Sequence, residues 1–382
     1  MQFSSLRGID RPKEIVQRAV DSGKLSHALL LLGPEGNGKL AFAAALAAYL
    51  NCKTPIEGDS CGKCPDCVKS AKLVHPDIHF ILPYPGTLSD EQKSPTAEVI
   101  HEFRPKFIEN PWLELEDWKH ALAADNKQLG IGVNEIRLLK KRMSLKAFEG
   151  RFKVVIIWGA DKMNGSAANS FLKLLEEPPD NTVLILTTID AADLLPTIRS
   201  RCQTLLMNRI PANEIGAYLQ TKYNLEEQQA LQVALMAEGS MRKAQVLAEK
   251  DTQAVSEKFP AWMRLCYEAK MDEISKLAED FSRESREFQK FFMESALHRV
   301  RETLKVRFLP EDQLLFPGAE IQFLKKFNQI LTDAKLEKIA TLIDEAVYHV
   351  GRNANAQMLM VSLSLRIHKV LREKITPNPI LH

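Results

Sequence analysis

The chain has 382 residues, of which 45% are hydrophobic and 26% are charged, and its formal net charge is +2. This composition is typical of a soluble protein, and so small a charge excludes binding to a polyanion through an overall positive charge. The length predicts two or three domains. The N-terminal segment lacks the basic-then-apolar order of a secretory signal, and the longest apolar run (40–50) is too short to cross a bilayer. We therefore expect a cytoplasmic protein without membrane contact.

The first half of the chain is predicted to be an α/β domain that ends near residue 210. Three apolar runs, 27–33, 152–160 and 181–189, have the length and composition of buried strands. Their hydrophobicity is continuous, as a parallel sheet covered on both faces requires.

The second half of the chain is predicted to be all-α. After Pro211 the strand signals stop, and apolar residues recur at helical spacing. We expect a small helical unit at 211–250, which ends near Lys250 and Asp251, and a longer helical bundle at 257–382.

The stretch GPEGNGKL (33–40) follows the first predicted strand and opens a helical pattern, which is the context of a phosphate-binding loop. Its glycines would let backbone N–H groups face a phosphate, and a lysine would add a positive charge; these residues are Gly33, Gly36, Gly38 and Lys39. A glycine turn with a chance lysine is the alternative.

Two features predict that this loop does not hydrolyse ATP. Leu40 stands where a serine or threonine would bind Mg²⁺. The strand at 152–160 runs into Trp158-Gly159, and its first following carboxylate, Asp161, comes three residues later than the acid that an ATPase needs. ATP and Mg²⁺ are therefore not expected to be used by this chain, although binding of a nucleotide without hydrolysis stays open.

Four cysteines in the pattern C-x8-C-x2-C-x2-C predict a structural zinc site; they are Cys52, Cys61, Cys64 and Cys67. All four ligand positions would come from the protein, so no position is left for water. Scattered redox cysteines are the alternative. Cys202 and Cys266 lie far away in the sequence and are expected to be ordinary buried thiols.

Residues 84–127, here called the inserted segment, are rich in proline, acid and tryptophan and lack clear strand character. We expect an insertion on the surface of the α/β domain. Trp112 and Trp118 would form a partner-binding loop or, as the favoured alternative, would fold back onto that surface.

The motifs together resemble one family. A zinc module directly after the phosphate-loop helix, AANSFLKLLEEPPDNTVLILTT (167–188) and IRSRCQ (198–203) resemble the clamp-loader subunits of bacterial DNA polymerase III, which are AAA+ proteins. The resemblance implies an AAA+ domain at 1–210 with a zinc module at about 52–67, a helical lid at 211–250 and a helical collar for oligomerisation at 257–382.

Within that family the departures at Leu40 and Trp158 resemble those of the delta prime subunit. The resemblance implies a non-hydrolysing stator that works with the tau/gamma and delta subunits to load the sliding clamp on primed DNA. An active ATPase similar to tau/gamma is the alternative. A zinc-dependent DNA-binding module is a third interpretation, which the near-neutral charge disfavours.

The resemblance also implies residue roles. Arg201 matches the arginine finger that a subunit extends into the ATP site of its neighbour, with Ser200 and Cys202 to position it; a solvent-facing arginine is the alternative. Arg242, in GSMRKA (239–244), matches the second sensor or serves only in packing of the lid.

The expected roles of four further residues leave alternatives open. Thr187 or Thr188 holds the first sensor position, where a structural role is favoured. Glu176 and Glu177, near a helix C-terminus, would meet partners in the assembly or, as favoured, stay solvated.

Overall fold

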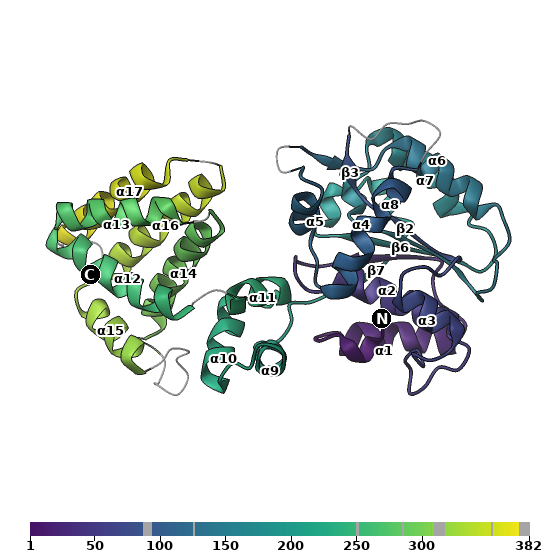
Figure 1. Cartoon of the computed structure of the whole chain (residues 1–382), viewed down its shortest axis with the longest axis horizontal. Coiled ribbons are helices and arrows are strands. Elements are labelled where there is room, and N and C mark those ends of the chain that lie inside the picture. Colours follow the sequence, from purple (N-terminus) through teal and green to yellow (C-terminus); the bar gives the residue numbers. More distant parts are fainter. Residues whose placement is uncertain are drawn as a thin grey trace, which may run out of the picture. The chain divides into compact units, whose positions relative to one another are not determined.

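The computed structural model describes residues 1–86, 94–124, 127–249, 252–284, 286–306, 308, 318–352 and 354–373. The chain forms two compact units, one of residues 1–222 with 237–246 and one of residues 223–236 with 247–382 (Figure 1). Lys250 and Asp251, the expected end of the small helical unit, lie outside the described residues, and so do residues 374–382 of the expected collar. Among the helices of the described ranges, none is both long enough and apolar enough to span a membrane.

A five-stranded parallel sheet with the strand order β2-β5-β6-β1-β7 forms the centre of the first unit. The strands are β1 (Ala28–Leu32), β2 (Ile78–Ile81), β5 (Lys153–Ile157), β6 (Thr182–Thr188) and β7 (Gln203–Leu206). The three strands predicted from apolar runs are confirmed as β1, β5 and β6, which lie next to one another. A separate antiparallel pair joins β3 (Tyr84–Pro85) to β4 (Leu129–Gly130).

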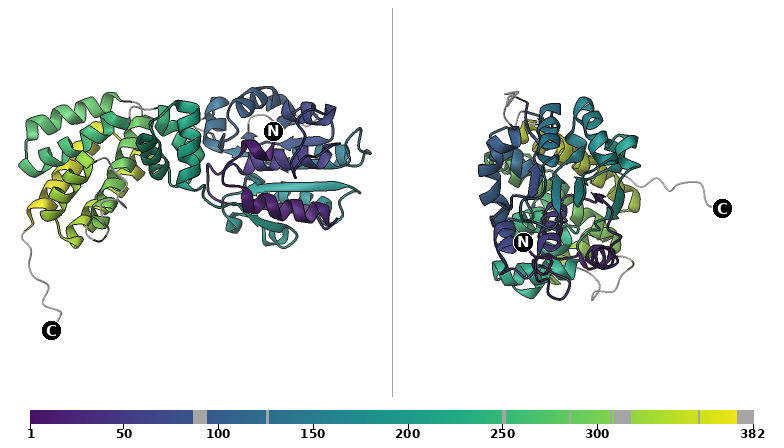
Figure 2. Two further views of the ribbon diagram at one scale, coloured as in Figure 1. Left: turned by 90° about the horizontal axis from the view of Figure 1, so that it is seen from below. Right: turned by 90° about the vertical axis from the view of Figure 1, so that its right-hand side faces the viewer.

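Helices cover both faces of this sheet (Figure 2). Leu30, Val155 and Leu186 share one hydrophobic core with α6 (Val133–Met143) and α7 (Gly165–Glu176). On the other face α2 (Lys39–Asn51), which is buried along its whole length, contacts β1, β5 and β6. Burial on both faces explains why the central strands read as continuous apolar runs.

Shorter elements complete the first unit. They are η1 (Phe3–Ser5), α1 (Asp10–Asp21), α3 (Pro65–Ala71), η2 (Ala160–Lys162), η3 (Ala191–Asp193), α8 (Pro196–Arg199), α9 (Ala212–Tyr223) and α11 (Met241–Glu249). The last residues of α9 and α11 belong to the second unit.

The described residues of the inserted segment form α4 (Pro95–Glu109) and α5 (Leu115–Ala121), and its aromatic side chains are part of the domain interior. Trp112 is 2% exposed and Trp118 is fully buried, so both fold back onto the domain as favoured, but into its interior and not onto its surface, and they do not form an exposed partner-binding loop. The Trp118 ring packs against Phe103 and Trp158, and its Nε1–H donates to the carbonyl oxygen of Pro83 at 2.8 Å. The indole rings are buried because a hydrophobic cluster beside the sheet accommodates them and satisfies this donor.

The second unit is helical throughout its described residues, as predicted. It contains α10 (Glu227–Met236), α12 (Thr252–Glu268), α13 (Met271–Arg283), α14 (Arg286–Lys305), α15 (Gly318–Gln329), α16 (Asp333–Gly351) and α17 (Ala356–Arg372). Trp262 is buried between Phe259 and Phe292, and its Nε1–H donates to Ser364 Oγ at 2.8 Å, which joins α12 to α17.

Candidate functional site

The phosphate loop connects β1 to α2 and keeps the strand, turn and helix that its sequence predicts. Gly38 caps α2 with a φ of +79°, a left-handed conformation that favours glycine. Lys39 begins the helix and is buried, and its Nζ donates to the carbonyl oxygen of Pro34 and to Asn37 Oδ1. Burial lowers the pKa of Lys39, and the attraction of Glu114 opposes that shift.

The loop glycines are each in close contact with a different segment. A Cβ atom on Gly33 would lie 2.0 Å from the carbonyl oxygen of Met207, after β7. On Gly36 it would lie 1.8 Å from Ser240 Oγ, before α11, and on Gly38 it would lie 2.5 Å from the ring of Trp112. These separations are too short for an added side chain, so packing against neighbouring segments, together with the positive φ of Gly36 and Gly38, accounts for the three glycines.

The positions expected to hold Mg²⁺ in an ATPase do not offer free oxygen ligands. Leu40 is buried and carries no oxygen. Asp161 pairs with Lys162 Nζ at 2.7 Å and accepts from Thr188 Oγ1 at 3.2 Å. Thr187 Oγ1 accepts from the N–H of Gly159, so both candidate sensor threonines have structural contacts.

The inserted segment supplies two acids to the loop region that the sequence analysis missed. The N–H of Gly36 donates to Glu114 Oε1 at 2.6 Å. Arg242 donates through Nε and Nη2 to both carboxylate oxygens of Asp117, over 2.7–3.0 Å. Glu114 and Asp117 are three positions apart, the spacing of a capping box, which could have predicted the start of α5. Nothing in the sequence indicates which segments these two acids contact.

Arg201 lies just after α8 on the surface of the first unit. Its Nη2 pairs with Glu176 Oε1 at 2.7 Å, and Nη1 donates to the carbonyl oxygen of Thr197 and to Ser200 Oγ. The side chain is 39% exposed. The SRC and LLEEPP motifs therefore meet in space, and Glu176 is paired within the chain itself.

The four predicted cysteine ligands come together. Their sulfur atoms all lie within 4.8 Å of one another, and none is in a disulfide. Four sulfurs around a zinc ion at about 2.3 Å each would be about 3.8 Å apart, and the Sγ atoms of Cys61 and Cys67 are separated by 3.8 Å. The cluster can therefore hold a tetrahedral metal ion.

Backbone N–H groups point at these sulfurs. Cys52 Sγ accepts from the N–H of Cys61, and Cys61 Sγ accepts from those of Lys63 and Cys64, over 3.2–3.5 Å. A hydrogen bond from Thr54, with those two N–H groups, lowers the pKa of Cys61 to about 5. Donors of this kind favour the thiolate, which is the form that binds a metal.

The remaining two cysteines behave as expected of ordinary thiols. Cys266 is buried, and Cys202 is half-buried against the core of the first unit. Burial raises the pKa of Cys202 to about 11 and that of Cys266 to about 12.

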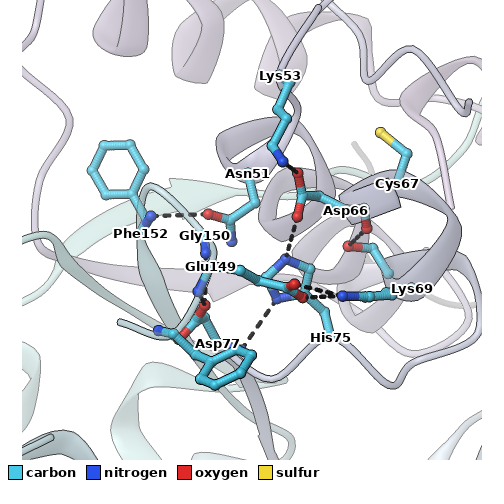
Figure 3. Close-up of polar contacts among 12 residues, drawn as sticks. Asn51, Lys53, Asp66, Cys67, Lys69, His75, Asp77, Glu149, Gly150 and Phe152 are labelled. Carbon is cyan, nitrogen blue, oxygen red and sulfur yellow. Dashed lines mark hydrogen bonds and ion pairs between the residues drawn. The ribbon is translucent and has the colours of Figure 1, made fainter. Parts of the chain in front are cut away.

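A second polar cluster beside the cysteines contains Asp66, His75 and Glu149 (Figure 3). His75 Nδ1 accepts a hydrogen bond from the N–H of Asp77, so in the neutral ring the proton is on Nε2, which faces Asp66 Oδ1 at 3.4 Å. Both Glu149 oxygens are already within 2.6 Å of Lys69 Nζ. Lys53 Nζ also lies 3.3 Å from Asp66 Oδ2, so a lysine pairs with each acid and the cluster has the contacts of an ion-pair network.

Asp77, in the same region, ties β2 to the loop that precedes β5. Its carboxylate accepts from the N–H groups of Phe148, Glu149 and Gly150, over 2.7–2.9 Å (Figure 3). Burial alone would raise the pKa of Asp77, but these three donors outweigh it and hold the pKa below its usual value. The histidine and aspartate of the HPD stretch (75–77) are thus structural.

Comparison with known proteins agrees with these motifs. A family model described as DNA polymerase III, delta subunit, matches residues 10–211. The delta' subunit of Pseudomonas aeruginosa is 35% identical over 177 residues, which are 46% of this chain and 42% of that protein. The delta' subunit of Bacillus subtilis is 30% identical over 197 residues, 51% of this chain and 46% of that protein. The chain thus spans less than half the length of these two relatives.

One solved structure aligns with a longer part of the chain. A DNA polymerase III gamma subunit-related protein of Thermotoga maritima aligns with 94% of this chain and 99% of that chain, at 17% identity and a TM-score of 0.39. The family match and the parallel sheet place the chain among AAA+ clamp-loader relatives. It belongs to the DNA polymerase III delta' subunit family.

Proposed function

We propose that this chain is a clamp-loader subunit that does not hydrolyse ATP itself and that helps the tau/gamma and delta subunits load the sliding clamp on primed DNA in the cytoplasm. The main support for this proposal is that side chains of the chain itself contact the phosphate loop. Glu114 accepts the N–H of Gly36, Leu40 is buried, and Asp161 is paired with Lys162. A loop without free ligands for Mg²⁺ supports a stator and argues against a motor.

The purified chain alone tests this part of the proposal. With ATP and Mg²⁺ we expect no turnover above a preparation of the K39A variant. Robust hydrolysis that K39A abolishes would instead favour the active tau/gamma-like ATPase.

Arg201 is proposed as the arginine finger for the ATP site of a neighbouring subunit. Its guanidinium is exposed, yet contacts with Glu176, Thr197 and Ser200 hold it at the end of α8. A fixed, accessible guanidinium has the properties needed to stabilise charge in a phosphoryl transfer, where such a residue contributes about 10³–10⁵ in rate.

The test compares R201A with R199A, since Arg199 is an exposed arginine at the end of α8, two positions before Arg201. Each variant is reconstituted with the other loader subunits, the clamp and primed DNA. We expect both variants to assemble, but only R201A to lower the clamp-stimulated ATPase rate. An unchanged rate with R201A in a fully assembled complex would contradict the finger role.

A structural zinc ion is proposed for the cysteine cluster, held by Cys52, Cys61, Cys64 and Cys67. Such an ion would supply no chemistry of its own; it would fix the fold of residues 52–71. Contacts from Asp59 to the N–H groups of Phe3 and Ser4 would in turn connect this module to the start of the chain.

The segment 211–250 is proposed as the lid and residues 257–382 as the oligomerisation collar. Support for the lid comes from its contact with the loop, where the N–H of Met241 donates to the carbonyl oxygen of Gly36 at 2.8 Å. Support for the collar is the helical bundle, whose described residues contain its own core around Trp262.

A further inference from the structure

The inserted segment makes a contact that a nucleotide phosphate would otherwise make. In a phosphate loop the backbone N–H groups before the helix point at phosphate oxygens. Here the N–H of Gly36 donates instead to Glu114 Oε1 at 2.6 Å, across 78 positions of sequence. A carboxyl oxygen from the chain itself therefore accepts a hydrogen bond of the loop.

The two cations expected to meet phosphate groups also face carboxylates of the inserted segment. Glu114 attracts Lys39, the lysine of the loop. Asp117 pairs with Arg242, the arginine in the second sensor position, through Nε and Nη2. A bidentate pair of this kind is the geometry with which arginine recognises both carboxylate and phosphate.

Trp112 covers the end of the loop. Its ring lies so close to Gly38 that an added Cβ atom would be 2.5 Å from Cζ3 and 2.9 Å from Cε3. Gly38 is the N-cap of α2, where the positive end of the helix dipole would meet a phosphate. The aromatic ring and the Glu114 carboxylate thus approach the loop from the same segment.

The two acids are fixed by the fold of α5. Glu114 is its N-cap, and its N–H donates to Asp117 Oδ2 at 3.0 Å in a capping box. One turn later Trp118 is fully buried and hydrogen-bonded to Pro83. Because the helix is anchored in the core, the carboxylates do not depend on a solvated loop for their position.

Glu114 is half-buried beside the loop. Loss of solvent raises the pKa of Glu114 to about 7, although Lys39 and the N–H of Gly36 act in the opposite direction. Glu35 and Asp117 add repulsion. The carboxyl group is therefore partly shielded from water at this contact.

We propose that Glu114 and Asp117 substitute for the phosphate groups of a nucleotide, so that the chain itself bridges the phosphate loop and the lid arginine and excludes nucleotide from this site. Glu114 accepts the N–H of Gly36 and Asp117 pairs with the guanidinium of Arg242. In an active relative a bound nucleotide would make these contacts. The proposal concerns the isolated chain, and it stands or falls independently of the role of Arg201.

The test is ADP binding with Mg²⁺, measured by titration calorimetry on the full chain. In E114Q/D117N both side chains keep their shape, but the negative charges are gone, so a diphosphate competes better for the loop. At pH 8, where Glu114 is mostly ionised, we expect ADP to bind the double variant at least about 10-fold more tightly than the wild type. The gain should disappear when K39A is added.

E116Q is the matched control, because Glu116 is an exposed acid on the same helix; it should behave as the wild type. The single variant E114Q keeps the pair of Asp117 with Arg242 and is measured in parallel, in case the double variant does not fold. Wild-type binding as tight as that of the variants would overturn the proposal. A folded variant, judged by circular dichroism, that gains no ADP binding would overturn it as well.

Discussion

Arg201 and Glu176 form an ion pair with a Nη2–Oε1 distance of 2.7 Å between the end of α8 and the end of α7. The pair joins the two motifs that most strongly marked the family in the sequence. It also gives Glu176 a partner for its charge, which is unfavourable at the C-terminus of a helix. The proposed finger is thus positioned by a neighbour that the chain supplies itself.

Removal of this partner should have little effect on stability. Both side chains are more than a third exposed, and solvent-exposed ion pairs contribute at most about 1 kcal/mol. For E176A we expect the free energy of unfolding, measured with urea, to change by no more than that. E177A is the control, and a loss above about 2 kcal/mol for E176A alone would show that the pair stabilises the fold.

Substitution of Asp77 should destabilise the first unit. D77A leaves the N–H groups of Phe148, Glu149 and Gly150 without their shared acceptor. Loss of charge-assisted hydrogen bonds in a buried position is expected to cost about 2–4 kcal/mol in the free energy of unfolding. Urea unfolding followed by tryptophan fluorescence measures the loss, and the exposed Asp180, as D180A, should show none.

The pKa of Asp77 also predicts an acid-dependent loss of stability. Its folded pKa lies below the unfolded value of 3.8, so the unfolded chain binds more protons in that range. The contribution is fully present above pH 3.8 and is lost as the pH falls through the folded pKa. D77N should flatten this acid limb of the stability curve, and an acid limb unchanged in D77N would contradict the assignment.

For Glu114 we predict the opposite pH dependence of the free energy of unfolding. Its folded pKa of about 7 lies above the unfolded value of 4.5, so the folded state binds more protons between these values. The free energy of unfolding should therefore fall as the pH rises from 4.5 through about 7, by at most about 3 kcal/mol. Thermal denaturation across pH 4.5–8 should show a flatter curve for E114Q but an unchanged curve for E116Q.

The cysteine cluster predicts a zinc content of about one equivalent per chain in a reduced preparation made without chelators. C64S should lower the content below about half an equivalent and make residues 52–71 more sensitive to protease. C202S, which alters a distant cysteine, should leave both unchanged. Wild-type zinc content in C64S would argue against tetrahedral coordination by these four residues.

The sequence predicted those parts of the fold that depend on continuous hydrophobicity. β1, β5 and β6 are central strands, and both faces are covered, so their apolar runs stand out. β2 and β7 were missed because each is a four-residue edge strand with polar residues. The cysteine cluster was predicted because its ligands lie close together in the sequence.

The contacts around the phosphate loop could not be predicted in the same way. Glu114 and Gly36 are 78 positions apart, and Asp117 and Arg242 are 125 positions apart. Proline and acidic residues made the inserted segment look like a surface addition, although the burial of Trp112 and Trp118 determines its place. The local amino-acid composition does not predict which distant backbone N–H group will donate to a given carboxylate.

The contact of Trp112 with Gly38 limits what a single substitution in the phosphate loop could restore. Replacement of Leu40 by serine would restore the consensus pattern, but the ring of Trp112 and the carboxylate of Glu114 would still stand against the loop. A serine at position 40 would therefore supply a hydroxyl group without clearing the loop, and we expect no ATP hydrolysis by the L40S variant alone.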